Sequence, residues 1–244
     1  MSDSNIEQGS IVINESPLIV ALDYPDLDQA LRMADLLDSK VCRVKVGKEL
    51  FTKEGPKIIE ALHRMGFEVF LDLKFHDIPN TTANAVAVAA ELGVWMVNVH
   101  ASGGRKMMEA CVNKLSTYTS PPLLIGVTVL TSMTEADLYE VGIHSSPLDH
   151  VAKLGELAKI SGLDGVVCSA HEASFLKQRL GSQFKLVTPG IRPSFSERGD
   201  QQRIMTPSEA LYAGSDYLVV GRPITQAEKP FDALAMVMQE IAQS

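Results

Sequence analysis

The chain has little cysteine, and its cysteines follow no metal-binding or disulfide pattern. The 244 residues include three, Cys42, Cys111 and Cys168, and no two of them form a CxxC pair. This spacing excludes zinc ribbons, thioredoxin-like motifs and disulfide scaffolds. Because an unpaired cysteine usually packs as a small hydrophobic side chain, we expect three buried thiols in a reducing compartment.

Long apolar runs and long basic runs are also missing. No stretch of about 18 apolar residues occurs, so we expect no transmembrane helix. The first basic residue is Arg32, so the charged start of a secretory signal peptide is lacking as well. We therefore expect a soluble, cytoplasmic protein with no membrane partner.

The charge balance is acidic. The chain has 30 Asp and Glu residues against 22 Lys and Arg residues, which gives a net charge of −8. Such a chain is a poor candidate for binding nucleic acid. If its substrate is a small anion, the cations that hold that anion must be gathered at one place against the overall field of the protein.

What the sequence does contain is a regular alternation of short β-branched runs with amphipathic segments. Eight runs are predicted as strands, at a spacing of about 30 residues, which is the size of one βα unit. They are 18–23, 42–46, 68–74, 95–100, 123–129, 165–169, 185–188 and 217–220.

Helical periodicity fills the segments between these strands. Four helices are predicted, over 27–37, 58–62, 83–92 and 154–160. No linker rich in Pro, Gly or Ser divides the chain, so we expect one α/β domain, a (β/α)8 TIM barrel over residues 17–244, after a flexible tail of residues 1–16. The alternative is an open doubly wound sheet, but no GxGxxG motif or P-loop favours it.

Several predicted strands carry charged residues where a barrel strand should be apolar. From Glu68 to Lys74, side chains of one parity are apolar and suit the helix layer, whereas Phe70, Asp72 and Lys74 point towards the barrel axis. The same alternation places further polar side chains inside, at Asp23, Lys45, Asn98 and His100. Active sites of TIM barrels lie at the C-terminal ends of the strands, so these residues are predicted to form one.

The charges within this group suggest separate roles. A lysine flanked by carboxylates keeps its proton. Lys74 has Asp72 two residues before it and is therefore a candidate proton donor. Lys45, on the preceding strand, extends the alternating array of cations and carboxylates. Arg43 and Glu68 lie deeper in their strands, and we expect them to form a supporting ion pair at the barrel floor.

Two other interpretations of this segment stay open. Asp72, His76 and Asp77 could bind Mg²⁺, although two nearby lysines disfavour a bare cation. His76 and His100 could act as general bases, although a hydrogen-bonded structural role is favoured for both. The chain has no HExxH motif and no GxSxG nucleophile elbow.

The last two predicted strands are followed by a candidate anion site. Arg192 lies after the seventh strand, and Gly221 and Arg222 follow the eighth, the place where TIM barrels frequently bind phosphate. Residues 194–199 are polar and lack periodicity, so they could form a plain solvent loop or a lid over the anion, with Gln201 at the base of the lid. Thr131, after the fifth strand, adds a hydroxyl suited to the edge of an amide-like ring.

Six blocks of sequence, in order over residues 18–225, form a recognisable set. They are VALD (20–23), VKVG (44–47), FLDLKFHDIPN (70–80), VTVLT (127–131), PGIRP (189–193) and VGRP (220–223). With these blocks the chain resembles the orotidine 5′-phosphate decarboxylase family. Related sugar-phosphate barrels share the Asp-x-Lys-x-x-Asp core, whereas the HDIPN, GIRP and GRP segments are typical of the decarboxylases.

The resemblance implies decarboxylation of orotidine 5′-monophosphate to UMP and CO₂, the last step of de novo pyrimidine biosynthesis. It implies no cofactor and no metal, and a homodimeric barrel with shared active sites. Lys74 would protonate a C6 carbanion, Asp72 would lie against the departing carboxylate, and Lys45 would order the network and contact the ribose region. Asp77 and Thr81 would reach into the partner's site.

The resemblance also implies the binding residues. Asp23 would bind ribose hydroxyls, and Thr131 would lie near the pyrimidine. The phosphate would be bound by Arg192, Gln201, Gly221 and Arg222. These phosphate contacts agree with the anion site inferred above from the strand ends, whereas the sharing of sites between subunits is the one part that spacing does not indicate.

Two rival functions share the predicted barrel. One is a Mg²⁺-dependent sugar-phosphate aldolase or decarboxylase, which needs a metal to stabilise an enediolate. The other is a non-catalytic barrel that senses a phosphorylated ligand. A chelator separates the first from a cofactor-free decarboxylase, and a Lys74→Ala variant that binds ligand without turnover excludes the second.

Overall fold

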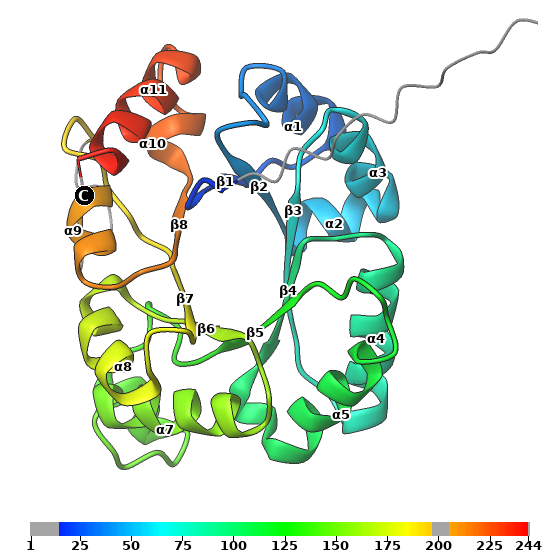
Figure 1. Cartoon of the computed structure of the whole chain (residues 1–244), viewed down its shortest axis with the longest axis vertical. Helices are drawn as coiled ribbons and strands as arrows, with labels where there is room; N and C mark the ends of the chain where they lie inside the picture. Colours follow the sequence, from blue (N-terminus) through cyan, green and yellow to red (C-terminus); the bar gives the residue numbers. More distant parts are fainter. Residues whose placement is uncertain (1–14, 197–204, 244) are drawn as a thin grey trace, which may run out of the picture.

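The eight predicted strands form one closed parallel barrel. The computed structural model describes residues 15–196 and 205–243. Each strand pairs with the next, and the eighth pairs with the first, which confirms the predicted TIM barrel (Figure 1). The strands are β1 (Leu18–Leu22), β2 (Arg43–Gly47), β3 (Val69–Phe75), β4 (Met96–His100), β5 (Leu123–Val127), β6 (Gly165–Val167), β7 (Lys185–Thr188) and β8 (Tyr217–Val220).

Helices surround the barrel in Figure 1. They are α1 (Leu27–Ala34), α2 (Lys48–Glu54), α3 (Pro56–Arg64), α4 (Pro79–Glu91), α5 (Arg105–Leu115), α6 (Glu135–Glu140), α7 (Pro147–Ile160), α8 (Ala173–Leu180), α9 (Pro207–Tyr212), α10 (Arg222–Thr225) and α11 (Pro230–Ile241). All four predicted helices are present. Helices α3, α4 and α7 begin earlier than predicted, each at a proline, because proline suits the first helical turn but carries no amphipathic signal.

The alternation of side chains along the strands separates two apolar cores. Val69 and Leu71 belong to the larger core, between the strands and the helices. Phe70 belongs to the smaller one, inside the barrel, as predicted from its parity. The other buried members of the inner core are Ile19, Ala21, Met96, Ile125, Val187 and Val219. These apolar side chains fill the barrel interior below the C-terminal ends of the strands, and the charged side chains lie at those ends.

Strand β3 departs from regular geometry near its end. The pairing of β3 with β4 shifts register between Leu71 and Phe75, and Lys74 has a φ of 52°. Among the described residues, Lys74 is the one non-glycine residue with positive φ. The regular alternation of side chains therefore breaks at Lys74, the predicted proton donor.

The barrel floor carries the predicted ion pair. The Nε atom of Arg43 lies 2.8 Å from Oε2 of Glu68, and its guanidinium stacks 4.1 Å above the ring of Trp95. The three cysteines are buried and free, as expected. Burial raises the pKa of Cys42 and of Cys111 to about 12, which keeps both thiols protonated and unreactive.

The prediction of a tail over residues 1–16 falls almost wholly on residues 1–14, which lie outside the described residues, and the domain boundary at residue 17 stays a prediction. Within the described ranges, no helix is both long enough and apolar enough to cross a membrane.

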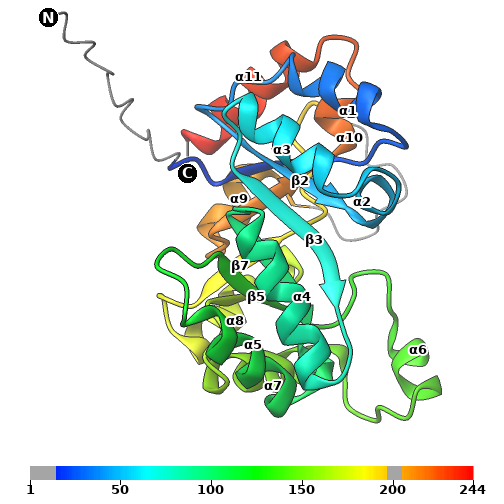
Figure 2. The ribbon, with the colours of Figure 1, turned by 90° about the vertical axis from the view of Figure 1, so that its right-hand side faces the viewer.

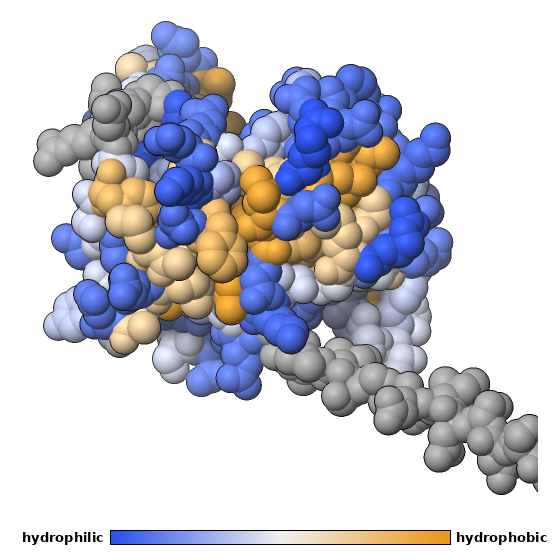
Figure 3. Space-filling model, turned by 90° about the horizontal axis from the view of Figure 1, so that it is seen from above, coloured by the Kyte–Doolittle hydropathy of each residue, from blue (hydrophilic) through white to orange (hydrophobic). Residues whose placement is uncertain are grey.

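The outer surface near α1 and α11 is mixed in character. Seen from this end of the molecule, hydrophilic side chains surround a central apolar area (Figure 3). Exposed apolar side chains on α11 include Phe231, which is 64% exposed, and Met236. Exposed apolar residues are common on globular proteins, so this area assigns no partner by itself.

Candidate active site

Four charged side chains meet at the C-terminal mouth of the barrel. The Nζ atom of Lys45 lies 3.0 Å from Oδ1 of Asp23 and 3.4 Å from Oδ2 of Asp72, and Nζ of Lys74 lies 2.5 Å from Oδ1 of Asp72. The predicted alternating array of cations and carboxylates is thus present as a chain, Asp23–Lys45–Asp72–Lys74. The mouth is the side of the barrel from which α6 projects and towards which β3 runs in Figure 2.

The strand register explains why these residues meet. Lys45 pairs with Ala21 on one side and with Phe70 on the other, and Asp72 pairs with Gly47. Gly47 leaves room for the array, because a Cβ atom there would lie 3.3 Å from Nζ of Lys45 and 3.4 Å from Oδ1 of Asp23. A larger side chain at position 47 would press on this ion pair.

Burial and charge act in opposite directions on the inner members of the array. Burial disfavours the charge of Lys45, but the carboxylates of Asp72 and Asp23 outweigh it and raise the pKa of Lys45. Burial likewise disfavours the charge of Asp72, but Lys45 and Lys74 outweigh it and lower the pKa of Asp72. At neutral pH the centre of the array is therefore ionised.

A fifth residue, Asn98 on β4, is part of the array. Its side chain is fully buried, donates from Nδ2 to Oδ1 of Asp72 at 2.7 Å, and accepts at Oδ1 from the backbone N–H of Lys74 at 2.7 Å. The alternation of β4 predicts that Asn98 points inwards as part of the active site, but it does not predict the contacts that Asn98 makes there. The signal that could have identified it is a polar side chain on β4 level with Asp72.

Among the described residues, Asp77 and Thr81 make no ion pair or hydrogen bond with this array in the single chain. Both are exposed, Asp77 just after β3 and Thr81 in the first turn of α4. Asp77 Oδ1 accepts from the N–H of Ile78 at 2.6 Å. Across residues 15–196 and 205–243, no ion pair connects Asp77 to the array. Their predicted contact with a second subunit stays a prediction.

The two histidines of the mouth contact each other. The rings of His76 and His100 lie 5.4 Å apart between centroids and are tilted by 42°. Burial, together with the nearby His76, Lys48 and Lys74, lowers the pKa of His100. Among the described residues, no three His, Cys, Asp or Glu side chains are grouped in a way that could hold a metal ion.

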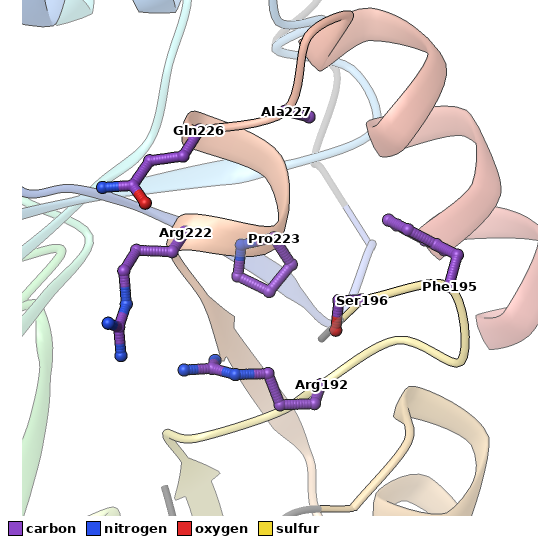
Figure 4. A pocket seen from close by; sticks show the side chains of 7 residues that line it. All are labelled: Arg192, Phe195, Ser196, Arg222, Pro223, Gln226 and Ala227. Carbon is purple, nitrogen blue, oxygen red and sulfur yellow. The ribbon is translucent and has the colours of Figure 1, made fainter. Parts of the chain in front are cut away.

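The predicted anion site contains a cavity of about 370 Å³, which is lined by Arg192 and Arg222 (Figure 4). Arg192 is buried and Arg222 is exposed at the start of α10, and both guanidinium groups extend into the same region in Figure 4. The remaining lining residues are Phe195, Ser196, Pro223, Gln226 and Ala227. Two cations in one cavity suit a dianion such as a phosphate ester.

The other predicted binding residues lie around these two centres. A Cβ atom on Gly221 would lie 3.5 Å from Cβ of Ala21 and 4.0 Å from Oδ2 of Asp23, so the anion cavity adjoins the Asp23 end of the array. Thr131 is exposed in the segment after β5. Gln201 and residues 197–199 of the predicted lid lie outside the described residues.

One hydrogen bond joins the two centres, and the sequence did not indicate it. The hydroxyl of Tyr24, the residue after Asp23, donates to the carbonyl oxygen of Thr225 at 3.0 Å. Thr225 ends α10, the short helix that begins with Arg222. The hydrogen bond thereby fixes the segment that holds Asp23 relative to the helix that holds Arg222.

Comparisons with known proteins show the family to which the chain belongs. The sequence model of the "Orotidine 5′-phosphate decarboxylase / HUMPS family" matches residues 16–237. Orotidine 5′-phosphate decarboxylase of Marinomonas sp. (strain MWYL1) is 62% identical over 228 residues, which cover 93% of this chain and 97% of that protein. The Vibrio cholerae protein of the same name is 62% identical over 233 residues, covering 95% of this chain and 99% of that protein.

A solved structure has the same fold. The crystal structure of orotidine 5′-phosphate decarboxylase from Lactobacillus acidophilus superposes with a TM-score of 0.83 at 39% identity, and the match covers 93% of this chain and 99% of that one.

Proposed function

This chain belongs to the orotidine 5′-phosphate decarboxylase / HUMPS family, and we propose that its charged array performs the decarboxylation through a C6 carbanion. The reaction converts orotidine 5′-phosphate to UMP and CO₂ in pyrimidine biosynthesis. The observation that carries the proposal is the Lys45–Asp72–Lys74 contact set, with separations of 3.4 and 2.5 Å, beside a cavity with two arginines.

In the proposed complex, the phosphate lies in the cavity between Arg192 and Arg222. Gln201 and the backbone at Gly221 complete the phosphate contacts. Asp23 and Lys45 bind the ribose, Thr131 lies at the pyrimidine, and the carboxylate on C6 faces Asp72. The arrangement of phosphate, ribose and carboxylate is supported by the arrangement of the charged residues. The cavity adjoins Asp23 at one end of the array, and Lys74 lies at the other end.

In the proposed reaction, the bond between C6 and the carboxylate breaks and its electron pair stays on C6. The ammonium of Lys74 transfers a proton to C6, and the lysine is then reprotonated from water. The preorganised ammonium stabilises the negative charge as it develops, which is the largest contribution available to a reaction without an electron sink. Ionised Asp72 repels the substrate carboxylate, and departure of CO₂ relieves that repulsion. No cofactor and no metal take part.

The assembly that we propose is a homodimer in which Asp77 and Thr81 of each chain complete the partner's site. The exposure of both residues at the barrel mouth supports this arrangement. We further propose that residues 17–244 act as one catalytic domain, and that the protein works in the cytoplasm, where its three free cysteines would stay reduced.

The test is ultraviolet absorbance of orotidine 5′-phosphate incubated with the purified protein. We expect wild type to consume the substrate at an unchanged rate in EDTA, and Lys74→Ala to lose turnover while it still binds UMP. An absorbance that stays constant at micromolar enzyme would overturn the proposal. Loss of activity in EDTA would favour the metal-dependent rival, and equal turnover by Lys74→Ala would remove Lys74 as proton donor.

A further inference from the structure

We propose that Asn98 is a positioning residue that fixes Lys74 for its proton transfer. The inference rests on the proposed role of Lys74 and goes beyond it. Asn98 is fully buried on β4, and its amide contacts Lys74 and Asp72 at once, with both hydrogen bonds at 2.7 Å.

The first contact holds the main chain of Lys74. Lys74 lies in the register shift of β3 with a φ of 52°, a conformation that residues with a side chain rarely adopt. A backbone in such a conformation persists only where its surroundings hold it. The Oδ1 atom of Asn98 accepts the N–H of Lys74 and so supplies a fixed partner at this point.

The second contact holds the other end of the lysine side chain. Oδ1 of Asp72 accepts both from Nδ2 of Asn98, at 2.7 Å, and from Nζ of Lys74, at 2.5 Å. Asn98 therefore sets the position of the carboxylate that directs the ammonium. One amide thus fixes Lys74 at its backbone nitrogen directly and at its ammonium through Asp72.

The chemistry of both partners requires an amide, or a group that imitates one. The N–H of Lys74 can only donate and the ionised Asp72 can only accept, so the residue between them must offer one acceptor and one donor in fixed geometry. A neutral carboxylic acid has the same shape and offers the same two groups. An ionised carboxylate has no donor and repels Asp72.

This requirement gives a test with opposite outcomes for two variants. In Asn98→Ala we expect kcat for orotidine 5′-phosphate to fall about 100-fold, the usual effect of a displacement near 1 Å at a reacting group. KM and the Kd of UMP should change little, because the phosphate and ribose contacts lie elsewhere. The matched control is Thr188→Val, which removes another fully buried polar contact, from Oγ1 to the carbonyl oxygen of Tyr217 at 3.2 Å.

Asn98→Asp supplies a readout that a merely structural role would not move. The titratable groups around the substituted carboxyl are Asp72 and Lys74, which Asn98 contacts, and Lys45 and His100, which interact with Asp72. We expect kcat of this variant, divided by that of wild type, to rise as pH falls and the new carboxyl becomes neutral. The same ratio for Asn98→Ala should stay constant with pH.

Three results would overturn the inference. They are a loss of kcat in Asn98→Ala no larger than in Thr188→Val, a parallel weakening of UMP binding, and a flat pH ratio for Asn98→Asp. If Asn98→Ala does not fold, the pH ratio of Asn98→Asp decides alone. Failure of the proposed function is recognised separately, because it requires that wild type be inactive or that Lys74→Ala be active.

Discussion

The hydroxyl of Tyr24 donates a 3.0 Å hydrogen bond to the carbonyl oxygen of Thr225. The bond runs from the segment after β1, which holds Asp23 of the charged array, to Thr225, the last residue of α10. Arg222 is the first residue of the same short helix. Tyr24 is partly buried, and burial raises the pKa of its hydroxyl. The donor is therefore protonated throughout the neutral range, and the contact joins the proposed ribose and phosphate sites.

Removal of this hydroxyl should weaken use of the phosphate. For Tyr24→Phe we expect kcat/KM for orotidine 5′-phosphate to fall about 5-fold, which corresponds to one net hydrogen bond. The rate with orotidine should change less, because orotidine has no phosphate for Arg222 of α10 to bind. Steady-state kinetics with both substrates measure the difference. Tyr118→Phe is the control, since its hydroxyl, in the segment after α5, contacts Glu91 of α4 at 3.1 Å. Equal losses with both substrates would contradict the coupling.

Arg222 should contribute to the rate as well as to binding. Charge-assisted hydrogen bonds to a phosphate are strong, so we expect Arg222→Ala to lower kcat/KM for orotidine 5′-phosphate by about 100-fold. Phosphite added to wild type should partly restore turnover of orotidine, because an anion in the cavity can position the segments around it without a covalent link. Arg179→Ala, which breaks an outer ion pair with Glu156, is the control. If phosphite has no effect, phosphate binding does not drive the chemical step.

The sequence predicted those parts of the site that follow from strand periodicity. The alternation of β3 placed Phe70 and Asp72 inside, and a parallel barrel then required Lys45 of β2 to lie beside them. The eight strands and the floor pair of Arg43 and Glu68 follow from the same two rules, and the structure confirms them.

Contacts between distant segments were beyond these rules. The positive φ of Lys74 carries no local signal, because no glycine marks the bulge and its partner, Asn98, lies on the next strand. The Tyr24–Thr225 bond joins the first and last βα units and involves a backbone carbonyl, which every residue has. Periodicity identifies the face on which a side chain lies, but not the atom that it contacts.

Sharing of sites between subunits can be tested by mixing two inactive variants. Lys74→Ala and Asp77→Asn should each be nearly inactive alone. In a mixed dimer, one site combines Lys74 of one chain with Asp77 of the other and is intact, so random exchange restores about one quarter of all sites. The measurement is turnover after the two variants are unfolded and refolded together. A mixture no more active than its components would place Asp77 outside the partner's site.

The stability of the array should depend on pH in a direction set by Asp72. Its pKa lies below the ordinary value, since Lys45 and Lys74 outweigh the effect of burial. Ionised Asp72 therefore stabilises the fold above its unfolded-state pKa of about 3.9, and the contribution is lost as pH falls through the lower folded-state pKa. We expect Asp72→Asn to lower the free energy of unfolding by about 3 kcal/mol at pH 7, as for a buried ion pair that loses one partner.

Urea unfolding of wild type and Asp72→Asn from pH 7 to pH 3 measures this difference, which should stay constant down to about pH 4 and shrink only below it. Asp164→Asn is a control of opposite sign. Burial raises the pKa of Asp164, although its carboxylate accepts from the N–H of Leu124 at 2.7 Å, so wild type should gain stability relative to this variant as the pH falls towards 4. A difference for Asp72→Asn that already shrinks between pH 7 and pH 5 would mean that burial outweighs the two lysines, and that Asp72 is not held ionised beside the substrate carboxylate.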